Sequence, residues 1–369
     1  MVTKIFGIMR SNFPGFYSLS KELLDEVWGK AVLILDTNVL LDFYRVSPDT
    51  QSDLLRVVKY YAEQNRLWIP YQVATEYHDN LYKVIFEQVK KYDETLNILK
   101  DFLNSISQKR NHPFLTDKFI RRINNLKRDL ERYFEQQRKK LRDSVGDATL
   151  KDDIANIFEG HIGEPFNEEQ LNSIYEEGKK RYALHIPPGF EDRKKGEPDM
   201  YNDFLVWNEV MEFSKENNVP VFFISSDTKK DWYLIEQGQT ICPLPALVKE
   251  FNLKTNQHIL MFTLERFLSL AKERKVVHVQ EDSIKEVKTK DEKSADGSSL
   301  IFTFYKHFKK PTEAKSGQVE TLFKDYKFCG SKILDLLSDE ADELGSTTSN
   351  SVGKDDNNTN NEYNNNSNS

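Results

Sequence analysis

Two short apolar runs, each followed closely by an aspartate, most constrain the fold of this 369-residue chain. Residues 31–35 (AVLIL) precede Asp36, and residues 219–224 (VPVFFI) are followed by two serines and Asp227. Strands that are apolar on both faces are typical of the centre of a parallel sheet covered by helices. Ligands collect at the carboxyl ends of such strands. The sequence therefore predicts an α/β fold with Asp36 and Asp227 at one edge of the sheet.

Two further acids follow the same alternation of strand and helix. Residues 67–70 (LWIP) predict another strand, and the helix expected after it carries Glu76. Residues 201–215 predict an amphipathic helix with Asp203 in its first turn. Residues 259–263 (ILMFT) predict the last strand of the unit. Four acids from distant segments are thus expected to converge.

The segment between about residues 80 and 150 has a different character. It is long, charged and nearly free of glycine and proline, with an interruption at residues 111–113 (NHP), which predicts a hairpin of two long helices. Residues 81–150 contain 16 Lys and Arg against 10 Asp and Glu, a surplus of 16 − 10 = +6. This arm is a candidate surface for a nucleic-acid backbone or a protein partner. A solvated hairpin with charge pairs along each helix explains the same composition.

Composition sets the limits of the folded part. We expect an α/β domain over residues 1–275, with a helical insertion at about 80–185, and a linker with a small C-terminal extension over residues 276–345. The Asn-rich residues 346–369 cannot build a core, so a disordered tail is predicted. The sequence is also compatible with a homo-oligomer.

Charge and targeting signals narrow the class of protein. The net charge of −7 argues against a generally basic nucleic-acid coat. The most apolar stretch, AVLILDTNVLLDF, is interrupted by charge and too short to span a bilayer. The N-terminus lacks the apolar core of a signal peptide, and Cys242 and Cys329 match no metal-binding spacing. These features favour a cytoplasmic protein with reduced thiols and no membrane span.

The expected acidic cluster indicates a metal site. Ionised carboxylates repel one another when they share a site, and divalent cations neutralise that repulsion. All-oxygen ligands favour Mg²⁺ or Mn²⁺ over zinc. Two such ions can activate water, orient a phosphodiester and stabilise the leaving oxygen. Metal-dependent hydrolysis of phosphate esters is therefore the predicted chemistry.

Four segments together resemble the PIN-like nuclease family: LDTNVLLDFYR, IPYQVATEY, YNDFLVW and VFFISSDTKKDW. The likeness covers about residues 10–270, and it is nearest to the branch with a long helical insertion after the second acid. One departure is Asn202, where related sequences often have glycine, but the neighbouring acid is present. The resemblance implies a three-layer α/β fold with a central parallel sheet, and a metal-dependent endonuclease with RNA favoured over DNA. Family members often serve as toxins or defence effectors.

The resemblance also implies roles for individual residues. Asp36 would be the central metal ligand, and the catalytic and metal-binding set would be Asp36, Glu76, Asp203 and Asp227. Neighbours that hold the acids or a metal-bound water would be Thr37, Asn38 and Ser226. Asp231 is a lesser supporting candidate; a surface position is the simpler expectation for it, as for Asp192 and Asp199.

Other readings compete with this hypothesis. An aspartate after a strand is often only a helix cap, and Asp203 is also the kind of acid that the helix dipole favours. Arg45 suits either a phosphate contact or a surface salt bridge. A catalytically degenerate PIN-like scaffold is the main alternative function, and a phosphatase acting on small esters is a further one. Metal binding would separate the nuclease from the scaffold.

Overall fold

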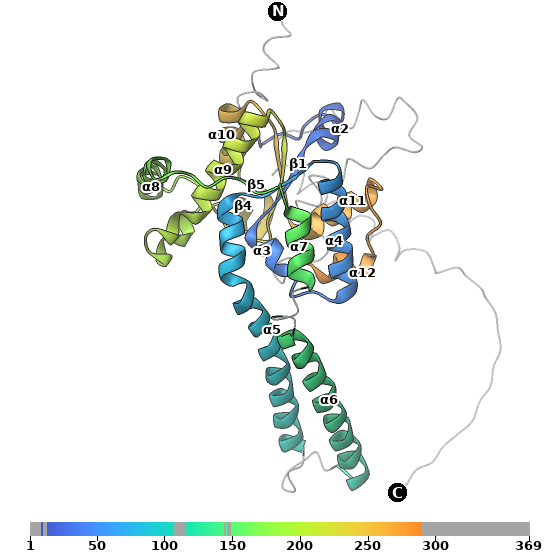
Figure 1. The fold of residues 1–369 in the computed structure, drawn as a ribbon. Helices are drawn as coiled ribbons and strands as arrows, with labels where there is room; N and C mark the ends of the chain where they lie inside the picture. The colour runs from blue at the N-terminus through green and yellow to red at the C-terminus, as the bar shows by residue number, and fades with distance from the viewer. Residues whose placement is uncertain (1–8, 10–12, 107–114, 144, 146–148, 289–369) are drawn as a thin grey trace, which may run out of the picture. The chain divides into compact units, whose positions relative to one another are not determined.

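Four parallel strands form the central sheet of the computed structural model, which describes residues 9, 13–106, 115–143, 145 and 149–288. The strand order is β2-β1-β3-β6, so the two strands that precede Asp36 and Asp227 are neighbours at the centre. Figure 1 shows helices around this sheet. The strands are β1 (Val32–Leu35), β2 (Leu67–Trp68), β3 (Val221–Ile224) and β6 (Ile259–Phe262).

Strand β3 shows why the sheet is buried on both faces. Successive side chains of a strand point to opposite faces. The ring of Phe222 lies 4.7 Å from Trp28 on one face, between ring centroids, whereas that of Phe223 stacks 5.3 Å from Trp232 on the other. Every residue of β1 and β3 is buried. The predicted α/β fold with a central parallel sheet is therefore confirmed.

Helices cover the sheet and fill the crossovers between its parallel strands. In chain order, the described α-helices are α2 (Lys21–Lys30), α3 (Thr37–Asp42), α4 (Pro48–Glu63), α5 (Tyr71–Ile106), α6 (Asp117–Asp143), α7 (Thr149–Phe158), α8 (Glu168–Ala183), α9 (Asn202–Asn217), α10 (Pro245–Thr255), α11 (Leu264–Glu273) and α12 (Glu281–Glu286). Two 3-10 turns, η1 (Phe190–Lys195) and η2 (Asp199–Tyr201), lie between α8 and α9.

Helices α5 and α6 form the expected pair of long helices (Figure 1). Tyr92 and Phe134 pack edge to face across the pair, with ring centroids 5.1 Å apart, and Arg138 of α6 forms an ion pair with Asp93 of α5. No side chain of α6 is fully buried. Helix α5 begins at Tyr71, so the helix that carries Glu76 continues directly into this pair. That the pair is an insertion into the family fold stays a prediction.

A short hairpin follows β3. Strands β4 (Tyr233–Glu236) and β5 (Gln239–Pro243) pair antiparallel. The two residues between them, Gln237 and Gly238, both have positive φ, at 51° and 80°. Positive φ at both central positions is the requirement of a tight hairpin turn. Glycine meets it at no steric cost, and the Gln-Gly pair is the signal for this hairpin.

Helices α4 and α12 cap each other. Glu286 of α12 accepts hydrogen bonds from the backbone N–H of Ser47 at 2.6 Å and the hydroxyl of Thr50 at 2.5 Å, at the start of α4. In return, buried Asp53 of α4 accepts from the backbone N–H of Gln280 at 2.7 Å, at the start of α12. These carboxylates satisfy backbone donors that a helix leaves free at its N-terminus. The packing thus continues past residue 275, the predicted end of the domain.

Parts of the sequence prediction fall on residues that the structure does not describe. Most of the expected extension, the Asn-rich residues 346–369 and Cys329 lie outside the described residues. Cys242 is buried. Among the described helices, none is both long enough and apolar enough to cross a membrane.

Phe222 provides a test of the core. It is fully buried in the aromatic cluster with Trp28, and Phe222→Ala leaves a cavity there. We expect the free energy of unfolding to fall by about 3–5 kcal/mol, measured by urea denaturation. The control Phe102→Ala removes a ring that is 53% exposed and should cost less than about 1 kcal/mol. Equal losses in the two variants would contradict this description of the core.

Candidate active site

Asp36 lies where β1 ends and α3 begins, and neutral donors hold its side chain. Its Oδ1 accepts from the backbone N–H of Thr37 at 2.7 Å, which makes Asp36 the N-cap of α3. Its Oδ2 accepts from the Asn38 amide at 2.5 Å and the Ser225 hydroxyl at 2.7 Å. Asp36 can therefore cap α3 and also take part in the acidic site. The geometry fixes the direction in which the carboxylate points.

The residues after β3 are joined to those after β1. Ser225 accepts a hydrogen bond from the backbone N–H of Asp227 at 3.1 Å while it donates to Asp36. The backbone N–H of Ser226 donates to the Asn38 side chain at 2.8 Å, and its hydroxyl donates to Asp42 at 3.2 Å. Asn38 and Ser226 thus join the two strand ends, and their supporting role in a metal site stays a prediction. Ser225, which the sequence analysis did not single out, connects the two aspartates directly.

Glu76 reaches this edge of the sheet from α5. Its Oε2 accepts from the Thr37 hydroxyl at 3.1 Å, and its Oε1 accepts from the side-chain amide of Gln72 at 3.1 Å. Glu209 of α9 accepts from the backbone N–H of Gln72 at 3.2 Å, which caps the start of α5. The structure thus brings Thr37 and Glu76 together. Glu209 positions the helix that carries Glu76, and the sequence analysis missed it.

Asp203 and Asp227 share a basic neighbour, Lys229. The Lys229 Nζ lies 2.7 Å from Asp227 Oδ2 and 3.8 Å from Asp203 Oδ2, and 3.0 Å from Oδ1 of Asp192 in η1. The Trp232 indole N–H also donates to Asp203, at 3.3 Å. The surface position expected for Asp192 was wrong, because its side chain is only 11% exposed and forms these ion pairs.

Two other interpretations of single residues are decided by their contacts. The surface position expected for Asp231 was wrong, because the residue is fully buried. Its carboxylate accepts from the backbone N–H groups of Gly189 at 2.9 Å and Glu191 at 3.1 Å, so it fastens the segment that carries Asp192. Arg45 forms a salt bridge with Asp42 at 2.9 Å, one of the two roles expected for it.

The acids of this cluster perturb one another. The pKa of Asp36 is raised to about 6, chiefly by burial and further by the charges of Glu76 and Asp227, against the hydrogen bond from Ser225. Burial also raises the pKa of Asp203 to about 7; Lys229 opposes that rise, while the neighbouring charge of Asp36 adds to it. Clustered carboxylates with raised pKa values are typical of functional sites that need a cation.

The donor set fits a divalent cation. Carboxylate oxygens are the ligands that Mg²⁺ and Mn²⁺ favour, and Asp36 and Glu76 present such oxygens, which neutral hydrogen-bond donors orient. Within the described residues, no three or more His, Cys, Asp or Glu side chains are grouped closely enough to hold an ion as they stand. Lys229 already occupies the carboxylates of Asp203 and Asp227.

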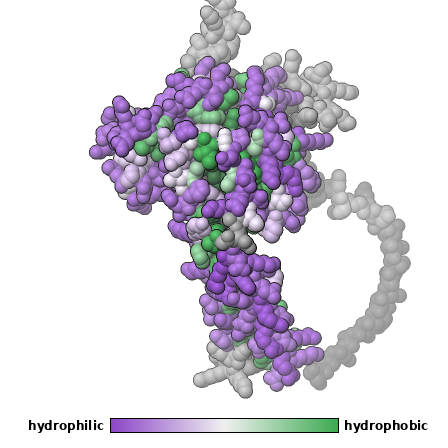
Figure 2. Space-filling view, viewed as in Figure 1, coloured by the Kyte–Doolittle hydropathy of each residue, from purple (hydrophilic) through white to green (hydrophobic). Residues whose placement is uncertain are grey.

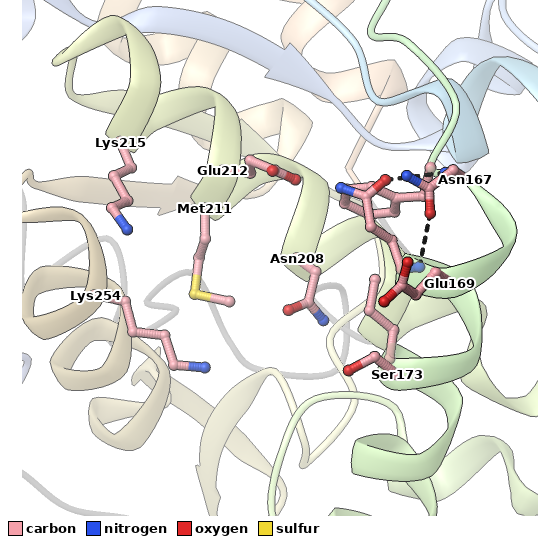
Figure 3. A pocket seen from close by; sticks show the side chains of 11 residues that line it. Asn167, Glu169, Ser173, Asn208, Met211, Glu212, Lys215 and Lys254 are labelled. Carbon is pink, nitrogen blue, oxygen red and sulfur yellow. Dashed lines mark hydrogen bonds between the residues drawn. The ribbon is translucent and has the colours of Figure 1, made fainter.

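A separate cleft of about 580 Å³ lies beside α9 (Figure 3). Asn208 and Met211 of α9 line it, together with side chains from α8 and Lys254 of α10. None of the four acids lines this cleft. Its polar groups include Asn167, which caps α8 through a hydrogen bond to the backbone of Gln170. We therefore place the candidate active site at the sheet edge.

A family profile decides the classification. The PIN-like domain profile matches residues 32–247, more than half of the chain, and the matched range contains all four acids. The chain belongs to the PIN-like domain family. PIN-like domains are generally nucleases, and they typically use divalent metals such as Mg²⁺ or Mn²⁺. No curated protein and no solved structure gave a significant match.

Glu209 gives the PIN-like domain a testable pH dependence. Burial raises its pKa to about 7, although the backbone N–H groups of Gln72 and Tyr71 oppose this. Because the pKa of Glu209 is higher in the folded state than in the unfolded state, its protonation stabilises the fold. This contribution to the free energy of unfolding is fully present below about pH 4.5 and is lost as the pH rises through 7. Between pH 4.5 and 8, the free energy of unfolding of the wild type should fall by up to about 3 kcal/mol relative to that of Glu209→Gln.

Urea unfolding in a metal chelator at both pH values measures this difference. Glu216→Gln, on the exposed side of the same helix, is the matched control and should follow the wild type at both pH values. An identical pH dependence in Glu209→Gln and wild type would show that the carboxyl of Glu209 is not strained by burial.

Proposed function

We propose that this PIN-like protein is a metal-dependent endonuclease that hydrolyses phosphodiester bonds, with RNA favoured over DNA. The observation that carries the proposal is the convergence of acids from four distant segments at the sheet edge. Thr37 donates to Glu76 beside Asp36, Ser225 connects Asp36 to Asp227, and Lys229 lies between Asp227 and Asp203. Carboxylates that share a site repel one another when ionised, and a bound cation relieves that repulsion.

In this proposal, Asp36 and Glu76 hold a divalent cation, which when bound supplies Lewis-acid chemistry for hydrolysis. Asp36 is suited to this role because Thr37, Asn38 and Ser225 fix its orientation. Glu76 is oriented by Thr37 and by Gln72 of its own helix. These neutral donors hold both carboxylates without neutralising them, so their charge is left for the cation.

The basic face of α6 supports a polymeric substrate. On this helix, exposed cationic side chains without a described ion pair include Lys118, Arg121, Arg122, Lys139 and Lys140. Figure 2 shows a largely hydrophilic surface over α5 and α6. Other charges do pair along the helices, as in Arg132 with Asp129 at 2.5 Å. These cations, for which the described residues provide no ion pair, are the part of the surplus that favours contact with a phosphate backbone over a small phosphate ester.

Asp36→Asn tests the proposed activity. The substitution keeps the shape of the side chain but removes the charge that holds a cation. Cleavage of single-stranded RNA in Mn²⁺ should fall by at least about 100-fold, because even residues that only orient metal ligands cost 10–100-fold. The assay follows end-labelled single-stranded RNA, tRNA, single-stranded DNA and duplex DNA, each with Mg²⁺ and with Mn²⁺.

Asp79→Asn is the matched control for this assay. Asp79 is an exposed acid one turn beyond Glu76 on α5, so the variant should cleave at the wild-type rate. Unfolding curves establish that both variants are folded. Cleavage by Asp36→Asn at the wild-type rate would refute the proposed mechanism. Failure of the wild type to bind Mn²⁺ in calorimetry would favour the scaffold alternative.

A further inference from the structure

Lys229 lies among three carboxylates that come from three different segments. Its Nζ is 2.7 Å from Asp227, 3.0 Å from Asp192 and 3.8 Å from Asp203. An ammonium group has three N–H donors on a compact charge, which matches three surrounding carboxylates. Each of these acids therefore has a fixed cationic partner before any metal ion binds.

The backbone of Lys229 is as firmly held as its side chain. Its N–H donates to Asp227 Oδ1 at 3.1 Å, so the lysine engages both oxygens of that carboxylate. Its carbonyl accepts from the backbone N–H of Trp232 at 3.0 Å and of Tyr233 at 2.9 Å. The lysine is thus built into the turn after β3, and its side chain is only 33% exposed.

Asp192 pairs with lysine side chains and is not one of the proposed metal ligands. One of its oxygens contacts Lys229, and the other contacts Lys195 at 2.6 Å. Buried Asp231 fastens this segment to the turn that carries Lys229. Two loops are therefore held together so that acid and lysine face each other.

Among the residues that the structure describes, no such cation contacts the other half of the site. The contacts of Asp36 are the neutral groups of Thr37, Asn38 and Ser225, and those of Glu76 are Thr37 and Gln72. Lysine charge thus offsets part of the negative charge of one half, while the described contacts of the carboxylates in the other half are with neutral donors. A site that held two metal ions symmetrically between its acids would not need a lysine in one half.

We infer that the Lys229 ammonium takes the place of a second metal ion, so that the centre binds a single divalent ion at the Asp36 and Glu76 half. The inference rests on the proposed nuclease function, because it states how many divalent ions that function uses. Lys229 is a positioning residue for Asp203 and Asp227, which it keeps paired in the absence of metal. It also presents a fixed positive charge beside the metal for an anionic substrate such as a phosphodiester.

Counting bound ions tests this inference without an activity assay. Isothermal titration calorimetry with Mn²⁺, supported by native mass spectrometry, should give one ion per chain for the wild type. Lys229→Met removes the ammonium but keeps most of the side-chain volume, and it should bind two ions. Lys230→Met is the matched control, since Lys230 is exposed and adjacent, and it should bind one ion.

Thermal unfolding in a chelator gives a second readout. Lys229→Met should unfold a few degrees below Lys230→Met, because three carboxylates lose their shared cation, and Mn²⁺ should remove that difference. Lys229→Arg keeps the charge and should still bind one ion, which covers the case in which Lys229→Met does not fold.

The outcomes separate the two proposals. Two ions on the wild type, or one ion on folded Lys229→Met, would overturn the role of Lys229 and leave the nuclease proposal standing. Two ions on Lys229→Arg would overturn it as well. No Mn²⁺ on the wild type would overturn the metal-dependent function itself, and with it this inference.

Discussion

The parallel pairing of β1 with β3 is the interaction on which the site depends. The pairing runs in register to the last residue of each strand, with Leu35 opposite Ile224, and the backbone N–H of Asp36 still donates to Ile224 at 2.9 Å. Asp36 and Ser225 are therefore level where the strands end. A slip of one residue would turn every side chain to the opposite face and separate the two aspartates. The aromatic packing of Phe222 and Phe223 on opposite faces makes that slip costly.

Charge in the site is distributed unevenly around that edge. Asp36 has a raised pKa, and the described groups that donate to it are neutral, whereas Asp203 and Asp227 lie against Lys229. Hydrogen bonds from neutral donors orient a carboxylate while leaving its charge available. An ion pair orients a carboxylate and uses its charge. At this edge of the sheet, Asp36 and Glu76 thus keep their charge for a ligand, whereas Asp203 and Asp227 are paired with Lys229.

The parts of the site that follow from strand ends were predictable, and the parts that depend on loop paths were not. Asp36 directly follows one apolar run and Asp227 follows the other after two serines, so the parallel-sheet argument places both at one edge. Ser225 was within reach of the same argument, because it lies opposite Asp36 once the register is known. Asp192 and Lys229 could not be found this way. They meet because Asp231 binds the backbone of a distant turn, and no spacing along the chain encodes that contact.

Glu209 illustrates a different limit. Its position on α9 is unremarkable in sequence, and its role comes from the start of another helix that happens to face it. Burying a carboxyl group is costly unless it finds donors, and the unpaired N–H groups at the beginning of α5 supply them. A buried acid in an apolar helix pattern is a signal that such donors exist. Which helix supplies them is decided only by tertiary packing.

The continuity of α5 ties the candidate site to the long helical pair. Glu76 lies near the start of a helix that runs unbroken from Tyr71 to Ile106, with no proline or glycine to provide a kink. At about 1.5 Å per residue, the far end of α5 is about 45 Å from Glu76. Sharp helix kinks need a specific local cause, and this helix offers none in its sequence. Because Glu209 fixes its first turn, a displacement of the helical pair must strain the contacts that orient Glu76, so the two parts are mechanically coupled.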